Sequence, residues 1–462
     1  MKTKFVLVPL LAALVLAGCA TTPAPVPELP AAPTAFHEGD AAWARVVPAE
    51  AQPRGAWWLA FADPVLADLV ARADQANGDI ARAAARLAQA RALLRSADAD
   101  RLPQLGASAG ASRGADGTTA GRATTVLQTG ASLSYEVDLF GRLAGASDAA
   151  SLDAKSRAAL LQSTRLVVQA DVAQSYLTLR LLDNERALVR DTVAAYRDTL
   201  RLTERRFAAG DLSELEVERV RGEMAATESD ALALDRRRAQ LEHALAVLTG
   251  ESATSFRIEP VTTAAALPVI PAGVPSTVLA RRPDVAAAQA TLQAAQARVG
   301  IAQSAWLPNL SLTANGGYAS AELSDLFKWP ARAWGIGALL SMPLFDGGRR
   351  EAGIANARAE LDAAFASYRE QVLVAFRDVE DELASLRLLG EQEQALARAV
   401  DAATRATTLS ESRYRNGLVS QLDLLDAKRN ELRNRRQVLQ VRAARYQSTV
   451  GLIRALGGGW TV

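Results

Sequence analysis

Leu102-Pro103-Gln104-Leu105 recurs as Leu307-Pro308-Asn309-Leu310, and Leu139-Phe140 recurs as Leu344-Phe345, both at an offset of 205 residues. Further along the chain, Arg206-Phe207-Ala208-Ala209-Gly210 recurs as Arg413-Tyr414-Arg415-Asn416-Gly417, at an offset of 207. The order of elements is therefore duplicated. Each half is predicted to contain a helix, two strands, a very long helix, a tight turn and another helix.

Two pairs of amphipathic strands are predicted next to these motifs. Apolar and polar or small residues alternate over 127–138 and again over 334–342, and the partner strands are expected at 104–113 and 309–318. Each strand is about ten residues long, which is the length of a tilted membrane-spanning strand. Because the smallest transmembrane barrels have about eight strands, four strands would have to share a barrel with other chains. The alternative is a soluble four-stranded sheet that caps a helical rod.

The rest of each half is predicted to be helical. No proline occurs from Gln104 to Glu259 or after Pro343, and apolar residues in these segments keep a seven-residue period typical of coiled coils. If residues 142–209 form one helix, that helix is roughly 100 Å long at ~1.5 Å per residue. Residues 347–415 are expected to form its twin.

Both long helices are predicted to end at matching turns. Each turn offers a glycine that can adopt the left-handed conformation and a serine that can cap the next helix. The simplest interpretation is a pair of helix hairpins, but exposed Leu418 and Val419 favour a docking surface. The candidate contact residues are Gly210, Asp211, Leu212, Ser213, Gly417, Leu418, Val419 and Ser420.

The N-terminus predicts export and lipidation. Two lysines precede an apolar run that ends at Leu16-Ala17-Gly18-Cys19, which is typical of a lipoprotein signal peptide. The run is too short to span a bilayer. Cys19 is the only cysteine in the chain, so it has no partner for an internal disulfide, and we expect it to carry the lipid. Residues 22–33 are rich in proline and alanine and are predicted to be a tether.

These patterns divide the chain into five predicted segments. They are a signal peptide at 1–18, a lipidated tether at 19–62, a first repeat at 63–258, a linker in the equatorial region at 259–275 and a second repeat at 276–462. The net charge of +1 gives no electrostatic reason to expect nucleic acid. His37 and His243 lack metal-ligand spacing, and the glycine pairs lack a nucleotide-binding pattern, so we expect no metal, no cofactor and no enzyme activity.

Several motifs together resemble one family. Arg281-Arg282-Pro283-Asp284 is expected to start a helix, and Trp306-Leu307-Pro308-Asn309-Leu310-Ser311-Leu312 a strand. Pro343-Leu344-Phe345-Asp346-Gly347-Gly348, Tyr414-Arg415-Asn416-Gly417, Leu424-Leu425-Asp426-Ala427-Lys428-Arg429 and Ala455-Leu456-Gly457-Gly458-Gly459-Trp460 complete the set. The chain resembles the TolC-type outer-membrane efflux channels, and among them the NodT-like lipoproteins that serve resistance-nodulation-division pumps.

This resemblance implies a mainly α fold with a β-barrel part. Each protomer of a homotrimer would give four strands to a twelve-stranded outer-membrane barrel, and duplicated coiled-coil helices would form a periplasmic tube. The implied function is passive export of small molecules, with a periplasmic adaptor protein and an inner-membrane pump as partners, in a lipid-anchored protein of a Gram-negative outer membrane. The alternatives are a channel for type I protein secretion, which shares the fold, and a periplasmic adaptor lipoprotein.

The resemblance also implies a periplasmic gate at Leu422, Asp426 and Arg429. Leu422 would form an apolar ring, and Asp426 would pair with arginine across symmetry-related helices. The plainer alternative is a solvated ion pair on a coiled coil, worth about 0.3–0.5 kcal/mol. The first half has Val217-Glu218-Arg219-Val220-Arg221-Gly222 in place of the gate segment, so we expect the two hairpins to contribute unequally to the aperture.

Overall fold

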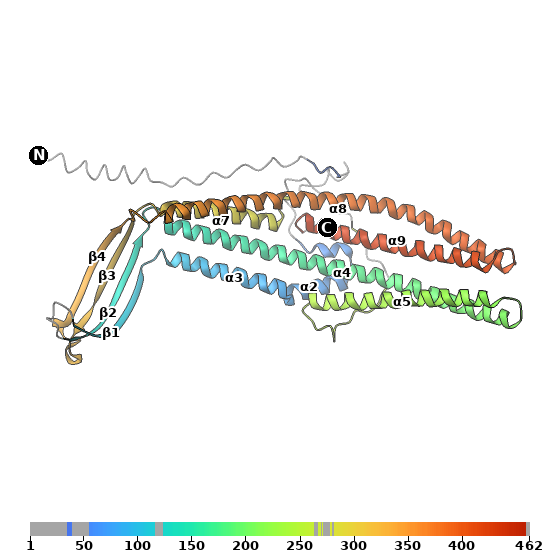
Figure 1. The fold of residues 1–462 in the computed structure, drawn as a ribbon, viewed down its shortest axis with the longest axis horizontal. Helices are drawn as coiled ribbons and strands as arrows, with labels where there is room; N and C mark the ends of the chain where they lie inside the picture. The colour runs from blue at the N-terminus through green and yellow to red at the C-terminus, as the bar shows by residue number, and fades with distance from the viewer. Residues whose placement is uncertain are drawn as a thin grey trace. The chain divides into compact units, whose positions relative to one another are not determined.

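The computed structural model describes residues 35–38, 55–115, 123–262, 267–268, 270, 278–279 and 281–458 (Figure 1). The predicted signal peptide, Cys19 and most of the predicted 259–275 linker lie outside these residues, so those assignments stay predictions. Among the residues that are described, no helix is both long and apolar enough to cross a bilayer.

Six of the α-helices in the described part of the chain form three pairs of identical length. The pairs are α3 (Gly78–Ala99) with α7 (Pro283–Ser304), 22 residues each; α4 (Arg142–Ala208) with α8 (Arg349–Arg415), 67 each; and α5 (Glu214–Leu248) with α9 (Gln421–Ala455), 35 each. The offset is 205 residues for the first pair and 207 for the other two, as in the sequence motifs. The predicted duplication is therefore confirmed for these three pairs of helices.

The four strands form one antiparallel sheet in the order β1-β2-β3-β4 (Figure 1). The strands are β1 (Gln104–Gly114), β2 (Thr124–Val137), β3 (Asn309–Ser320) and β4 (Arg332–Ser341). The strands start and end within a few residues of the predicted bounds. Short 3₁₀ turns, η5 (Leu323–Asp325) and η6 (Trp329–Ala331), lie between β3 and β4. Every residue of β1 is exposed and no strand residue is fully buried, so within the described chain neither face of the sheet is covered.

A pair of glycines lets the central strands approach. Gly130 and Gly317 face each other across β2 and β3, and a Cβ on Gly317 would overlap the backbone of Thr129 and Gly130. We therefore expect Gly317→Val to destabilise the sheet by about 1–3 kcal/mol through overpacking. Gly316→Val is the matched control, because a Cβ there meets nothing within 4 Å. Thermal unfolding of the two purified variants measures both effects, and equal midpoints would contradict the steric assignment.

Residue contacts divide the chain into two compact units, each drawing on both sequence repeats. Among described residues, the first unit contains Ala85–Ala159 and Ala287–Glu370, and therefore the sheet. The second contains the segment up to Ala84, Leu160–Ala286 and the chain from Gln371 onward, and therefore both helix hairpins. It also holds η3 (Trp57–Phe61) and α2 (Pro64–Ala76), where Asp63 caps α2 by accepting from Val65 N at 2.9 Å and Leu66 N at 3.2 Å.

The Arg281-Arg282-Pro283-Asp284 motif starts α7, as predicted, and joins three elements of the second unit. Arg282 Nη2 donates to Asp284 Oδ2 at 2.7 Å and to Asp378 Oδ2 of α8 at 3.1 Å. Its Nη1 donates to the carbonyl of Ala455, the last residue of α9, at 3.2 Å. Its guanidinium is buried, and bonding to the two aspartates raises the pKa of Arg282 against the lowering effect of burial.

Removing the Arg282 guanidinium should substantially lower the free energy of unfolding. Arg282→Gln leaves Asp378 and the Ala455 carbonyl without their buried cation, so we expect a loss of about 3–5 kcal/mol. Arg377→Gln is the matched control, because Arg377 also pairs with Asp378, at 2.8 Å, but its side chain is 64% exposed. The control should cost less than about 1 kcal/mol. Denaturant midpoints of the helical signal measure both variants, and similar losses would contradict the assigned role of burial.

Candidate functional site

The two hairpin tips have the local geometry that the sequence predicts. Gly210 and Gly417 adopt φ values of +82° and +70°, in the left-handed region that favours glycine. At the second tip, Ser420 accepts from Asp423 N at 3.2 Å while Ser420 N donates to Asp423 Oδ2 at 2.9 Å, forming a capping box. The first tip also has a capping box, in which Ser213 N donates to Glu216 Oε2 at 2.8 Å. Both tips are therefore fixed turns.

The tips present different surfaces. Leu418 is 72% exposed at the end of the α8–α9 hairpin, whereas Val419 and Leu212 are half-buried. The remaining tip residues, Gly210, Asp211, Ser213, Gly417 and Ser420, are exposed. A single exposed leucine is ordinary on a protein surface, so the docking role of the tips stays a prediction.

Next to the second tip, Arg429 of α9 joins the two hairpins. Arg429 Nε donates to Glu223 Oε2 of α5 at 2.5 Å, and its Nη1 lies 3.3 Å from Asp426 Oδ1 on α9. Bonding to Glu223 is the main cause that raises the pKa of Arg429. The Glu223 side chain is 14% exposed and that of Arg429 is 44% exposed, so this pair is better shielded than an ordinary surface pair.

A second ion pair repeats this link one heptad further from the tip. Arg436 Nη1 donates to Asp230 Oδ2 at 2.6 Å, and its Nε donates to Glu185 Oε1 of α4 at 2.8 Å. In the pairs Arg429–Glu223 and Arg436–Asp230, the arginine follows the acid by 206 residues. Because α5 and α9 are repeats offset by 207 residues, each pair joins nearly equivalent positions of the two helices. Together, the rungs at Arg429 and Arg436 form an ion-pair ladder between α9 and the α4–α5 hairpin.

An apolar cluster packs beside the first rung. It contains Tyr196 and Leu200 of α4, Val217 and Val220 of α5, and Leu425 of α9. The Tyr196 hydroxyl is buried without a hydrogen-bond partner, and burial, together with the charge of Glu223, raises the pKa of Tyr196 to about 12. The phenol therefore stays neutral. The cluster thus packs residues of α4, α5 and α9 together beside the first rung.

The three predicted gate residues lie on neighbouring turns of α9. Asp426 and Arg429 are in contact, as their spacing indicates. Leu422 is 40% exposed and is not part of the cluster to which Leu425 belongs. Leu422 is thus left available on the surface of the described chain, and the gate role of all three residues stays a prediction.

Sequence reasoning missed the three acids of the ladder, which are Glu185 on α4 and Glu223 and Asp230 on α5. The two acids on α5 lie in the heptad-patterned part of the first repeat, each one residue before an apolar seam position, Met224 and Ala231. The sequence did contain a signal for this pairing. Glu223 and Asp230 are seven residues apart, as are Arg429 and Arg436, and the two pairs are separated by nearly the offset between the repeats. The pairing is shifted by one residue from the 207-residue repeat offset of these helices, so a comparison of equivalent repeat positions does not reveal it.

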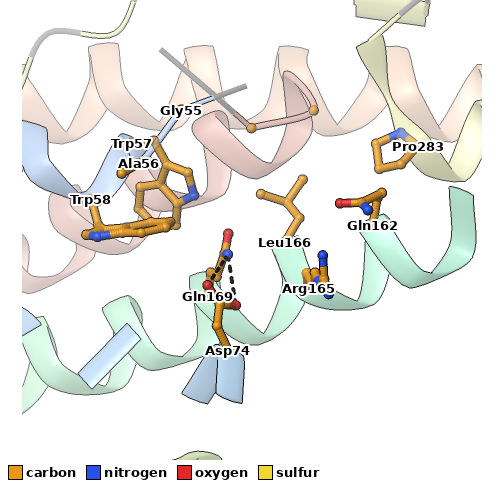
Figure 2. Close-up of a pocket in the computed structure, with 12 residues that line it drawn as sticks. Gly55, Ala56, Trp57, Trp58, Asp74, Gln162, Arg165, Leu166, Gln169 and Pro283 are labelled. Atoms are coloured by element: carbon orange, nitrogen blue, oxygen red, sulfur yellow. Dashed lines mark hydrogen bonds between the residues drawn. The ribbon is translucent and has the colours of Figure 1, made fainter. Parts of the chain in front are cut away.

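A cavity of about 470 Å³ lies elsewhere in the second unit (Figure 2). Gln169 of α4 donates to both oxygens of Asp74 of α2 at 3.0 Å, and the indole nitrogen of Trp57, turned toward the cavity, has no hydrogen-bond partner. The carboxylate is thus already bound by an amide. His243 is exposed, and no group of three metal-ligating side chains occurs among the described residues.

Comparison with known proteins agrees with this architecture. The outer membrane efflux protein family matches residues 69–251 and 274–458. The chain is 33% identical to outer membrane protein OprJ of Pseudomonas aeruginosa, covering 99% of this chain and 97% of OprJ. It is 29% identical to the probable outer membrane lipoprotein SilC of Salmonella typhimurium, covering 87% and 88%.

A solved structure gives the same result for the fold. The outer-membrane channel OprN superposes with a TM-score of 0.85 at 29% identity, covering 96% of this chain and 100% of OprN. The resemblance inferred from the motifs and the TolC-like fold are therefore confirmed. The family consists of efflux proteins rather than enzymes. With both repeats matched, the chain belongs to the outer membrane efflux protein family.

Proposed function

We propose that the protein is the outer-membrane channel of a tripartite efflux pump and exports small molecules passively. The observation that carries this proposal is the four-stranded sheet, whose residues are exposed or half-buried throughout and whose outer strands, β1 and β4, have no further partner strand within the described chain. Lipid does not tolerate open sheet edges. A homotrimer that joins three such sheets gives twelve strands and closes the barrel.

The two hairpins would form the periplasmic tube and its gate. In this proposal α9 carries Leu422, Asp426 and Arg429 to the constriction, and the ion-pair ladder holds α9 against the α4–α5 hairpin in the closed state. Opening requires α9 to move away from α5 and therefore to break both rungs. The first repeat lacks the equivalent pair of charged residues, because Arg219 and Gly222 occupy the positions that correspond to Asp426 and Arg429. This difference supports a gate that is carried by α9 rather than by α5.

The partners follow from the same arrangement. The tips at 210–213 and 417–420 would contact a periplasmic adaptor protein, which in turn would connect the channel to an inner-membrane resistance-nodulation-division pump. Lipid on Cys19 would anchor the chain to the outer membrane. Cargo selection would belong largely to the pump, because the channel supplies a passive path.

The rival functions make different predictions. A type I secretion channel shares the fold but would pass unfolded polypeptide, and a periplasmic adaptor would not form a barrel. Purification from the outer membrane in detergent, followed by light scattering, tests the proposal. We expect a trimer that needs detergent, whereas a monomer that is soluble without detergent would contradict the channel function.

A further inference from the structure

The cavity of about 470 Å³ has the size of a small-molecule site (Figure 2). Its described lining residues come from η3 and the two residues before it, from α2 and α4, from the start of α7 and from the turn after α9. All of them belong to the second unit. Pockets that bind small molecules typically have volumes of about 300–1,000 Å³, so this cavity is large enough for a ligand.

The walls of the cavity are held in place by close packing. The Trp57 ring makes edge contacts with Trp58 and Phe61, at centroid distances of 5.8 and 6.3 Å. Gly458 has a φ of +72°, and a Cβ on this residue would come within 2.6 Å of the Leu166 side chain. The turn after α9 therefore packs directly against α4. Walls of this kind give a preformed cavity.

Two hydrogen-bond donors at the cavity have no acceptor. The Trp57 side chain is 2% exposed, and its indole N–H, turned toward the cavity, is unpaired (Figure 2). Buried polar groups in folded proteins nearly always have a partner, so this N–H requires an explanation. Arg165 of α4 also lines the cavity and is half-buried, yet it forms no hydrogen bond or ion pair with any described residue.

The one acid among the described lining residues does not supply the missing acceptor. Asp74 accepts from the Gln169 amide at both of its oxygens, and it forms no ion pair with Arg165. The rest of the lining includes the apolar surfaces of Trp58, Leu166 and Pro283. A ligand that suits this site therefore has an anionic acceptor joined to a flat apolar body.

The polar lining is not part of the packing that the two repeats share. On α8, the positions that correspond to Arg165 and Gln169 are Val372 and Phe376. Val372 is buried, so α8 uses an apolar contact where α4 has a guanidinium. The second long helix thus packs without these polar groups, and their presence on α4 needs a reason other than helix packing.

We propose that this cavity is a binding site for a small aromatic carboxylate. The Arg165 guanidinium and the Trp57 N–H would donate to the carboxylate, and the aromatic ring of the ligand would lie against Trp58, Leu166 and Pro283. Such a ligand would join η3, α4 and the turn after α9, and it would stabilise the second unit by mass action. The proposal does not depend on the channel function.

The site is tested by titration calorimetry of the full-length protein in detergent, with 2-naphthoate as the probe and protein-free micelles as the blank. We expect saturable binding to the wild type. Arg165→Gln removes the cation that pairs with the carboxylate and should weaken binding about tenfold or more. Arg197→Gln is the matched control and should bind as the wild type does. Arg197 is an exposed arginine of α4 that does not line the cavity and has no bond to any described residue.

Two further variants test the roles of the other polar groups. Trp57→Phe keeps an aromatic ring but removes the N–H donor, so it should weaken 2-naphthoate binding several-fold. Asp74→Asn removes a negative charge from the cavity, so it should strengthen 2-naphthoate binding several-fold. The uncharged analogue 2-naphthamide should bind weakly and should not respond to Asp74→Asn. A gain of affinity for the anion alone is not produced by loss of structure.

Thermal unfolding without ligand checks that the variants are folded. With saturating 2-naphthoate, the midpoint should rise for the wild type and for Arg197→Gln, but not for Arg165→Gln. The site would be overturned by a lack of saturable binding to the wild type, or by equal affinity of the two arginine variants. The ligand class would be overturned if 2-naphthamide bound as tightly as 2-naphthoate. If Arg165→Gln does not fold, Asp74→Asn decides, and an unchanged affinity for 2-naphthoate would overturn the proposal.

Discussion

Arg429→Ala is expected to raise the single-channel conductance of the purified protein in planar bilayers, because it removes the rung of the ladder nearest the tip. The half-exposed pair with Glu223 is worth about 0.5–1 kcal/mol per protomer after discounting for solvent. Three copies that open together give about 1.5–3 kcal/mol, which is roughly a 10- to 150-fold shift of the closed-to-open ratio.

Comparing the conductance of several charge-removing variants distinguishes loss of the Arg429–Glu223 pair from loss of any charged side chain. Glu223→Gln should resemble Arg429→Ala, because it removes the same pair. Asp426→Ala should have a smaller effect, since its contact with Arg429 is 3.3 Å long and its side chain is 56% exposed. Arg221→Ala is the matched control: Arg221 is 48% exposed and pairs with Glu204 and Glu218, but it does not join the hairpins. An equal rise in this control would remove the gate assignment.

Leu418→Asp is expected to disconnect the channel from its periplasmic partner without changing its conductance. An exposed apolar anchor at the centre of an interface is typically worth about 2–4 kcal/mol, so affinity should fall roughly 30- to 1,000-fold. A photo-crosslinking residue at Val419, used in the native bacterium, measures the contact. The crosslinked periplasmic protein should disappear from the Leu418→Asp background.

The control for this prediction changes the same residue type away from the tip. Leu202 of α4 is 58% exposed, so Leu202→Asp adds the same charge to the helical part at similar exposure. Crosslinking should persist in Leu202→Asp. If both variants behave alike, the contact does not depend on the tip, and the docking surface lies elsewhere.

The fold could be predicted because it depends on periodic signals. The heptad seams predicted α4, α5, α8 and α9, and the left-handed glycines at 210 and 417 lie where the motifs place them. Alternation predicted the strands but not their full length. β2 begins at Thr124 and β4 at Arg332, because ladder hydrogen bonds continue past the residues that alternate clearly.

The contacts between hairpins could not be predicted in the same way. The sequence of a single helix does not predict that Arg429 binds Glu223 or that Arg436 binds Asp230 and Glu185. These pairings depend on how α9 packs against α4 and α5. The hydrogen bonds from the His37 and Glu38 backbone to Glu380 of α8 were also hidden, since backbone N–H groups leave no side-chain pattern. The periodicity of a sequence predicts where helices and strands lie. The alignment of two helices that are distant in the sequence is known only from the folded structure.

Single-channel recording of the wild-type trimer beside Arg429→Ala tests most directly that this chain is an outer-membrane channel closed by its own helices. Both proteins should insert into planar bilayers as detergent-purified trimers and give discrete conductance steps, small for the wild type and several-fold larger for Arg429→Ala. Verified trimers of both proteins that produce no conductance steps would contradict the account.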